Sequence, residues 1–529
     1  MAAAAPPVSH APVGEMIARA RLGALQASVD AVVGDLVARR APARLWSRDH
    51  TLWQDDPTDV ADRLGWLTVV TEMQGQIPRL EALAAEAVAD GLRHAVLLGM
   101  GGSSLFPEVL WRTFGAAPGS LDLRVLDTTD PAAVARVARD FDLASCLFVA
   151  ASKSGTTIET SSQLAHFWEL TGGDGRRFVA ITDPGTELAE LGRDRGFRAV
   201  FESRPDIGGR YSALSYFGLV PAALLGVDVA GLLAKAAAAA AATGPEVDGA
   251  TNPALHLAAI IAAGARQGRD KLTLELPREI GTFGLWLEQL VAESTGKAGT
   301  GIVPVAGEVL GRVGEYGDDR LFVSTGYRPG LDDLVEAGHP VVELGYRRPL
   351  DLGGLVLLWE QAVALSGAVL GINPFDQPDV AAAKEATDRV LAAGLPADIE
   401  VVPLGELIDQ VGPGDYLAIQ AYVDPGDPVL IAGLQAARMK LRHRLRVATT
   451  LGIGPRFLHS TGQLHKGGPP TGVFVQVVGD DPVDVAIPGK PFGFSTLKRA
   501  QAAGDLLALR SRGLRAGRVA LDELLAVTA

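Results

Sequence analysis

From His94 onward the chain alternates short runs of β-favouring residues with longer helical stretches. The first block has five such runs, at His94–Leu98, Leu123–Leu126, Cys146–Ala151, Phe178–Ile181 and Ala199–Phe201. Helical patterns such as Pro131–Arg139 and Ile158–Leu170 lie between them. Strands that alternate with helices of about ten to fifteen residues form parallel sheets with helices on both faces. This alternation predicts a doubly wound α/β domain over residues 91–245.

A second alternating block predicts a second α/β domain over residues 250–395. Its strands are expected at Lys271–Leu276, Ile302–Val305, Leu321–Ser324 and Val341–Leu344. An alanine-rich stretch at 232–242, typical of a packing helix, separates the two blocks.

The two ends of the chain carry different patterns. Residues 1–90 are expected to form a helical segment, with Met16–Ala20 already inside a helix, because apolar residues recur at spacings of three and four. Residues 396–529 predict an α+β extension, with strands at Tyr416–Val423 and Gly472–Val478 and a final helix from Ser495 onward.

The charge balance excludes two classes of partner. The 529 residues include 48 Lys and Arg against 62 Asp and Glu, a formal net charge of −14. A surface of that sign repels phosphate backbones and anionic lipids, so neither nucleic acid nor a membrane is expected as a partner. The apolar runs 214–234 and 352–372 are interrupted by charged residues, which favours core helices over membrane spans.

The cysteine count and the first residues indicate a compartment. Cys146 has no second cysteine with which to form a disulfide or a zinc cluster, which is typical of a reducing environment. Met1–Pro7 lacks the basic region and apolar stretch of a secretory signal. We therefore expect a cytoplasmic protein.

The first strand of the first block ends in a loop rich in glycine and serine, Gly-Met-Gly-Gly-Ser-Ser at 99–104, which leads into a helix. Glycines let backbone amides approach an anion, and a helix start adds a partial positive charge, so this loop can bind a phosphate group. A dinucleotide fold is the alternative, because Asp127 closes the next strand where a ribose-binding acid would stand. The glycine spacing is not Gly-x-Gly-x-x-Gly, which weighs against that alternative.

The third strand ends in a second polar loop, Ala-Ser-Lys-Ser-Gly-Thr-Thr at 151–157. Its hydroxyls and its lysine stand at the carboxyl end of a parallel strand, where open α/β sheets bind their ligands. The alternative is that the hydroxyls only cap the following helix. Neither loop has the spacing of a nucleotide P-loop, and together they favour a small phosphate monoester over a nucleotide.

These two loops resemble the sugar-isomerase (SIS) fold, and three further segments resemble the phosphoglucose isomerase family. They are 208–212 (Gly-Gly-Arg-Tyr-Ser), 288–297 (Glu-Gln-Leu-Val-Ala-Glu-Ser-Thr-Gly-Lys) and 377–380 (Gln-Pro-Asp-Val) with Lys384. The resemblance implies two SIS-type domains and the interconversion of glucose 6-phosphate and fructose 6-phosphate; a homodimer is expected. The residues that would hold the sugar phosphate are Ser103, Ser152, Ser154 and Thr157, with Lys153 beside them.

Aldose–ketose interconversion moves one proton between C1 and C2. It needs a base, a cation near the developing oxyanion and groups that open the ring, but no metal or redox cofactor. Glu293 stands near the end of a helix expected at Leu285–Glu293, and the resemblance assigns it as the base. A solvated helix-end glutamate is the alternative. Arg210 keeps its charge and suits an enediolate, whereas the alternative for it is a surface salt bridge.

Gln377 and Lys384 are candidates for contacts with the sugar ring. They stand seven residues apart, so both side chains would lie on one helix face if Pro378 lies in the first turn of a helix. The resemblance implies that Lys384 assists at the ring. The alternative is that both are solvated polar positions.

The chain departs from the family in its histidines. The family carries a ring-opening histidine soon after the base, whereas the next histidine after Glu293 is His339, in an Ala-Gly-His-Pro turn. A polar cluster at 456–469 contains His459 and His465, the candidates for the missing acid. The C-terminal part of the chain resembles that of the bacterial branch of the family that is sometimes fused to a transaldolase. The alternative is that both histidines stabilise a C-terminal loop. Their spacing is not that of a helical metal pair.

A non-catalytic phosphosugar-binding regulator on the same fold is the alternative function. Such a protein needs the phosphate loops but no base, so the joint presence of Glu293, Arg210, Gln377 and Lys384 favours the isomerase.

Overall fold

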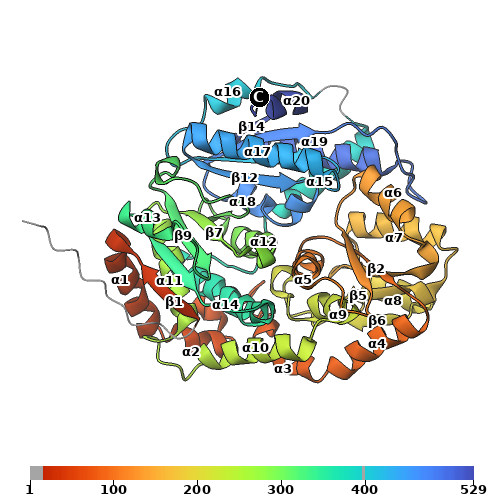
Figure 1. The fold of residues 1–529 in the computed structure, drawn as a ribbon, viewed down its shortest axis with the longest axis horizontal. Coiled ribbons are helices and arrows are strands. Elements are labelled where there is room, and N and C mark those ends of the chain that lie inside the picture. The colour runs from red at the N-terminus through yellow and green to blue at the C-terminus, as the bar shows by residue number, and fades with distance from the viewer. Residues whose placement is uncertain (1–15, 396–398, 529) are drawn as a thin grey trace, which may run out of the picture.

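The computed structural model describes residues 16–395 and 399–528. Its strands form three sheets with helices packed around them (Figure 1). In Figure 1 the first sheet lies to the right, the second to the lower left and the third at the top. Helices α5 (Leu105–Phe114) and α12 (Phe283–Thr295) lie between the three lobes, in the middle of the molecule.

The first predicted parallel sheet is confirmed. Its strand order is β3-β2-β4-β5-β6, and all of its pairs are parallel. Strand β4 is buried along its whole length, as its continuous apolar sequence requires of a strand covered on both faces. The strands are β2 (His94–Gly99), β3 (Asp122–Leu126), β4 (Cys146–Ala151), β5 (Phe178–Thr182) and β6 (Ala199–Glu202). The helices around them are α5, α6 (Pro131–Asp140), α7 (Ile158–Leu170), α8 (Glu187–Asp194) and α9 (Tyr216–Leu224).

The second sheet is also present, and it contains a strand that the sequence pattern did not predict. Its order is β1-β10-β9-β7-β8. Strand β1 (Ile17–Arg21) was expected to be helical, but it pairs antiparallel with the open edge of β10. The other strands are β7 (Lys271–Glu275), β8 (Val303–Val305), β9 (Arg320–Thr325) and β10 (Val341–Leu344). The helices are α10 (Val229–Ala242), α11 (Pro253–Arg266), α12, α13 (Leu331–Glu336) and α14 (Leu352–Leu370).

The rest of the N-terminal segment is helical, as expected. Its helices are α1 (Gln26–Ala38), α2 (Ala41–Trp46), α3 (Val69–Gln74) and α4 (Ile77–Ala89).

The C-terminal extension is an α/β unit rather than the α+β unit that the sequence suggested. Its strands β11 (Tyr416–Tyr422), β12 (Ala448–Ile453), β13 (Gly472–Val478) and β14 (Arg515–Arg518) are all parallel, in the order β12-β11-β13-β14. The helices of this part of the chain are α15 (Val380–Ala393), α16 (Leu404–Ile408), α17 (Pro428–Leu445), α18 (Gly462–Gly467), α19 (Phe494–Ser511) and α20 (Leu521–Ala526). The boundaries of the domains stay a prediction.

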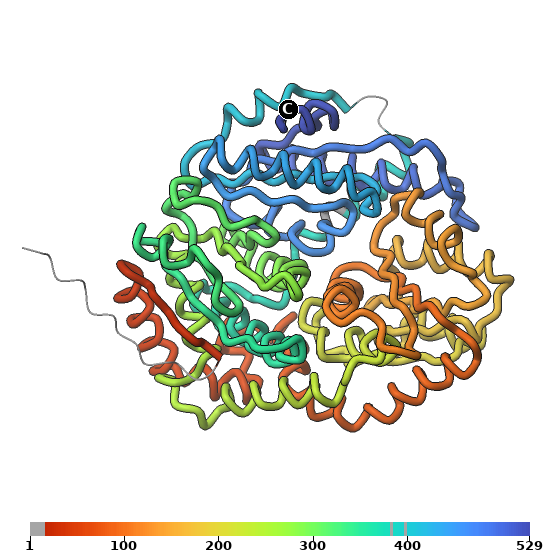
Figure 2. The backbone as a smooth tube through the Cα atoms, viewed as in Figure 1, coloured from red at the N-terminus to blue at the C-terminus, as the bar shows by residue number. Residues whose placement is uncertain are grey.

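The third unit contacts both of the other lobes. Lys498 of α19 donates to Asp130 of the first lobe at 2.8 Å, and Arg438 of α17 donates to the carbonyl of Ala306 in the second at 3.0 Å. Figure 2 shows this unit, in blue, lying across the top of the molecule. Residues at the end of β12 are thereby brought towards the first sheet.

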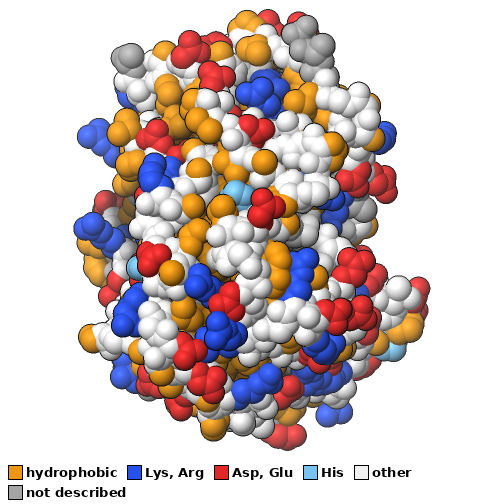
Figure 3. Space-filling model, turned by 90° about the vertical axis from the view of Figure 1, so that its right-hand side faces the viewer, with side chains coloured by type: hydrophobic (Ala, Val, Ile, Leu, Met, Phe, Trp, Pro, Cys, Tyr) orange, Lys and Arg blue, Asp and Glu red, His pale blue; other side chains and the backbone are white. Residues whose placement is uncertain are grey.

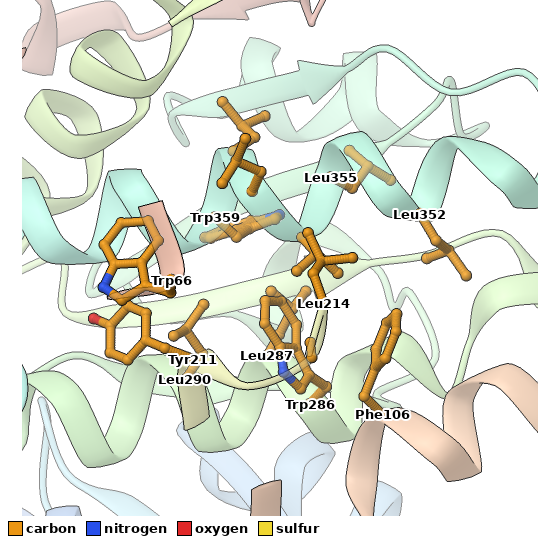
Figure 4. Packing of buried hydrophobic residues seen from close by; sticks show 14 of the residues in the cluster. Trp66, Phe106, Tyr211, Leu214, Trp286, Leu287, Leu290, Leu352, Leu355 and Trp359 are labelled. Carbon is orange, nitrogen blue, oxygen red and sulfur yellow. The ribbon is translucent and has the colours of Figure 1, made fainter. Parts of the chain in front are cut away.

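The largest hydrophobic core joins the first two lobes. Figure 4 shows part of it, with residues from α5, α12 and α14 packed around Tyr211 and Leu214. The ring of Tyr211 stacks on Trp66, with ring centroids 5.1 Å apart. Because Tyr211 is held in this core, the preceding residue, Arg210, is held in position too.

Helix α14 is a core helix, as predicted. Among the described residues, Pro349–Leu370 is long and apolar enough to cross a membrane, but its most apolar 18-residue window is entirely buried inside the protein. On the face of the molecule in Figure 3, basic and acidic side chains are interspersed.

Candidate active site

The two polar loops lie side by side at the carboxyl ends of β2 and β4, which are paired strands. The hydroxyls of Ser152 and Thr157 are 2.9 Å apart. Thr157 is the N-cap residue of α7, but its side chain makes no hydrogen bond to the helix start. The structure therefore does not support capping as the role of this hydroxyl, and both the hydroxyl and the first amides of α7 are available to an anion. Ser154, exposed, lies 3.1 Å from the hydroxyl of Thr156.

The first loop brings other segments close together. Gly101 has a φ of +54°, and a side chain there would lie 2.7 Å from the carbonyl of His459. A side chain at Gly102 would lie 2.0 Å from the carbonyl of Gly209. These glycines thus let the segments that carry His459 and Arg210 approach the end of β2. Ser103 follows them and is buried.

The side chain of Lys153 has its partners outside the loop. It forms an ion pair with Asp183, and its Nζ donates to the carbonyl of Pro205 at 3.1 Å. The sequence placed this lysine beside the sugar phosphate, whereas the structure directs it towards the neighbouring strand end.

Glu293, in the last turn of α12, is paired with Arg210. Its Oε1 lies 2.8 Å from the guanidinium, and both side chains are buried. Its Oε2 accepts a hydrogen bond of 3.0 Å from Gln289, one helical turn earlier. The neighbouring atoms Arg210 Nε and Gln289 Oε1 are buried without a hydrogen-bond partner. Glu293 and Arg210 are therefore neither solvated nor at the surface, and unused donors and acceptors remain beside them.

Gln289 was missed by the sequence analysis. Besides Glu293, its Nε2 contacts the carbonyl of His459 at 2.9 Å. It thus links the candidate base to the segment that carries the candidate acid. The signal was present, because residues four apart on a helix are neighbours.

Gln377 also meets Arg210. Its side-chain oxygen accepts a hydrogen bond of 3.3 Å from the guanidinium, and the carbonyl of Asp376 accepts another of 2.7 Å. Gln377 lies before α15, whose N-cap is Asp379, so it does not share a helix face with Lys384 as the spacing suggested. Lys384 is on α15 and exposed.

His459 and Lys384 line a cavity of about 140 Å³ together with Thr156 and Glu159. The Nε2 of His459 lies 2.9 Å from Glu159, and Gln501 donates to the same carboxylate oxygen at 2.6 Å. Burial would raise the pKa of Glu159, but the charge and hydrogen bond of His459 outweigh it and lower the pKa. A carboxylate that orients an imidazole suits that imidazole for proton transfer.

His465 occupies a core position instead. Burial, with a contribution from Lys466, lowers its pKa to about 3, and its Nδ1 lies 3.2 Å from Gln420. Its ring packs against those of Phe457 and Phe474. An imidazole that stays neutral cannot supply a proton near neutral pH, so the candidate role of His465 finds no support.

The dinucleotide alternative also fails at its key residue. Asp127 is buried and accepts hydrogen bonds from Arg456 at 2.7 Å and from Ser104 at 3.2 Å. A ribose-binding acid needs a free carboxylate. The described part of the chain contains no group of three or more His, Cys, Asp or Glu side chains that could hold a metal ion.

Lys297 is a second group that the sequence analysis did not single out. Its Nζ donates to the carbonyl and to the carboxylate of Asp376, both at 2.7 Å. The same carbonyl accepts from Arg210. Lys297 thus holds the segment that contacts the Arg210 guanidinium.

We expect kcat/KM to fall at alkaline pH as Lys297 loses its proton. Burial, together with nearby Arg210, lowers the pKa of Lys297 to about 8. Above this value the ammonium that holds Asp376 disappears, so Arg210 loses its alignment. Lys297→Arg keeps its charge and should move the alkaline limb to higher pH in a pH–rate profile. An identical limb in both proteins would assign it to another group.

Comparisons with known proteins identify the family to which the sequence is similar. A family described as phosphoglucose isomerase matches residues 58–305. The glucose-6-phosphate isomerase of Citrifermentans bemidjiense is 30% identical over 385 residues, which cover 61% of this chain and 72% of that protein. The glucose-6-phosphate isomerase of Thermosynechococcus vestitus is 31% identical over 399 residues, which cover 65% and 73%.

Two solved structures share the fold. A hypothetical protein from Thermus thermophilus has a TM-score of 0.60 at 24% identity, covering 71% of this chain and 100% of that one. A glucose-6-phosphate isomerase from Chlamydia trachomatis has a TM-score of 0.58 at 21% identity, covering 69% of this chain and 86% of that one.

Proposed function

The chain belongs to the phosphoglucose isomerase family, and we propose from this premise that Glu293 is the base with which it interconverts glucose 6-phosphate and fructose 6-phosphate. The observation that carries the assignment is the buried Glu293–Arg210 pair of 2.8 Å. A carboxylate can take the proton from C2 and return it to C1, while the guanidinium stabilises the negative charge of the enediolate. A binding protein would need neither group.

Ser152, Ser154 and Thr157 are proposed to hold the phosphate of the sugar, with Ser103 nearby. The support is the uncapped start of α7, where Thr157 leaves its hydroxyl free of the helix. Helix starts and hydroxyls are common ligands of phosphate oxygens. Lys153 has no part in this proposal because it is paired with Asp183.

We expect Ser152→Ala combined with Thr157→Ala to raise KM for the sugar phosphate by about tenfold or more, since each charge-assisted hydrogen bond contributes roughly 1.5–3 kcal/mol. Inhibition by inorganic phosphate should weaken in parallel. Steady-state kinetics with and without phosphate measure both effects. If phosphate inhibited the double variant as strongly as it inhibits the wild type, these hydroxyls would not be phosphate ligands.

His459 is proposed to open the pyranose ring. It shares a cavity with Lys384, and Glu159 holds its Nε2. Imidazole is suited to exchange a proton with the ring oxygen near neutral pH. Lys384, on the same cavity, would contact the ring from α15.

His459→Ala should therefore lower turnover of the cyclic substrate by about tenfold or more, whereas proton exchange at C1 and C2 of an open-chain analogue should change much less. The two rates can be compared by enzyme assay and by NMR. His443→Ala is the matched control, because its side chain is 72% exposed on α17. Equal losses on both substrates, or none, would remove His459 from ring opening.

The proposed activity is tested by incubating the purified chain with fructose 6-phosphate and measuring glucose 6-phosphate. A non-catalytic regulator would bind the sugar phosphate without converting it. Formation of glucose 6-phosphate that is lost in Glu293→Gln supports the isomerase.

We further propose that the protein is a cytoplasmic homodimer. The single cysteine, Cys146, is free and buried, which fits a reducing compartment. Light scattering of the purified chain and fractionation of cells test the two statements.

A further inference from the structure

A second cavity, of about 470 Å³, lies along the free edge of the first sheet. This volume is in the range of small-molecule sites. One wall consists of the edge strand β3 with helices α5 and α6, and the other of residues that follow β11 and β12, such as Gly426 and Arg456. The carboxyl ends of strands from two different parallel sheets therefore face one cavity. Ligands of open α/β sheets bind at such ends.

Four arginines line this cavity, namely Arg112, Arg124, Arg136 and Arg456. Each has a carboxylate partner, and the acidic residues Glu108, Asp127 and Asp140 line the cavity as well. Three of the arginines are in close pairs: Arg112 with Glu108 at 3.0 Å, Arg456 with Asp127 at 2.7 Å, and Arg136 with Asp424. A guanidinium has five N–H donors. Each of these three arginines donates one hydrogen bond to another described residue. Each guanidinium thus keeps N–H donors that have no partner among the described residues.

Arg124 is the least satisfied of the four. Its ion pair with Asp122 is long, at 3.9 Å. Its Nε is buried with no hydrogen-bond partner. Its guanidinium lies over the rings of Trp111 and Phe141, 4.7 Å and 5.3 Å from their centroids. The aromatic faces hold the cation in place without using its N–H groups.

We propose that this cavity binds a small organic phosphate. Planar guanidinium groups match phosphate oxygens in pairs, and Trp111, Phe141 and Ile431 offer apolar contacts to a carbon skeleton. No residue of the Glu293 site lines the cavity, so this cavity is separate from the active site.

The cavity is connected to the active site by a short segment. Arg456 begins the 3-10 helix that ends at His459, the residue held by Glu159. A phosphate that takes the unused N–H groups of Arg456 would therefore contact the segment that carries His459.

The test is calorimetric titration of the full chain with 3-phosphoglycerate, in a Ser152→Ala/Thr157→Ala background so that the phosphate loops of the active site do not compete for the probe. One molecule should bind per chain, and Arg124→Gln should weaken binding by at least tenfold. The matched control is Arg176→Gln, also on the first lobe, whose side chain is 82% exposed and does not line the cavity. Made singly in the wild-type chain, both Arg124→Gln and Arg176→Gln should keep isomerase activity and melting temperature in the absence of the probe.

Two further probes fix the chemical class. Citrate and inorganic phosphate should each bind more weakly than 3-phosphoglycerate, because one lacks the phosphate and the other the carbon skeleton. If citrate or inorganic phosphate binds more tightly than 3-phosphoglycerate, the proposal that the ligand is an organic phosphate is wrong. Absence of binding, or binding unchanged by Arg124→Gln, overturns the site itself. The measured heat does not depend on turnover, so failure of this proposal leaves the isomerase assignment intact.

Discussion

Glu293→Gln should lower kcat by about a hundredfold or more, the usual contribution of a positioned acid–base group. The amide has the shape of the carboxylate and can still accept a hydrogen bond from Gln289, which donates to Oε2 at 3.0 Å. It cannot take a proton from carbon. The phosphate loops are untouched, so KM should change little. Steady-state assays in both directions, with a melting curve for the fold, measure these effects.

Glu288→Gln is the matched control for this experiment. Glu288 is the same residue type on the same helix, but it lines a different, small cavity, with Leu285 and Arg456. Burial raises its pKa to about 7, so replacing it by a neutral amide is a mild change. Glu288→Gln should keep turnover near that of the wild type. Comparable activity of the two variants would remove Glu293 from the mechanism.

Replacement of Arg210 is expected to have an effect of similar size. Its guanidinium contacts Glu293, Gln377 and the carbonyl of Asp376 at once. Arg210→Met leaves the enediolate without its cation, and loss of one such preorganised group typically lowers kcat by about a hundredfold to a thousandfold. Arg210→Lys restores the charge but not the fork of donors, so it should recover only part of the loss. The measurement is kcat/KM for all three proteins.

Arg193→Met is the control for charge and size. Arg193 lies on α8 with its side chain 52% exposed and paired with Glu202, so activity should not change. If Arg210→Lys were as active as the wild type, charge alone would explain Arg210, and the geometry of its donors would not matter.

Buried parallel strands could be predicted from the sequence because their residues are apolar on both faces. Cys146–Ala151 was expected with the bounds that β4 has. Edge strands carry less of this signal. β1 (Ile-Ala-Arg-Ala-Arg) and β14 (Arg-Ala-Gly-Arg) are half polar, and they are strands because a neighbouring strand offers an open edge. Which edge of a sheet is open depends on the tertiary structure, so the local sequence pattern does not reveal these edge strands.

For the candidate site, too, the sequence predicts local features better than distant contacts. Residues within short motifs, such as Arg210 and Glu293, could be recognised, and Gln289 could have been found from its helical spacing to Glu293. Contacts between segments far apart in the sequence could not be predicted. Glu159 and His459 meet across 300 positions of sequence, because β12 of the third unit delivers the histidine to the start of α7. The spacing of Gln377 and Lys384 was misleading, because α15 begins only at Val380.

The central claim, that Glu293 moves a proton between C1 and C2, is tested most directly by isomerisation in deuterium oxide. Fructose 6-phosphate is incubated with the purified chain, and the glucose 6-phosphate formed is examined by NMR. A carboxylate base exchanges its proton with solvent during the enediolate's lifetime, so deuterium should appear at C2, and both product and label should be lost in Glu293→Gln. Product and label that form in Glu293→Gln at the wild-type rate would contradict the account, since another group would then move the proton.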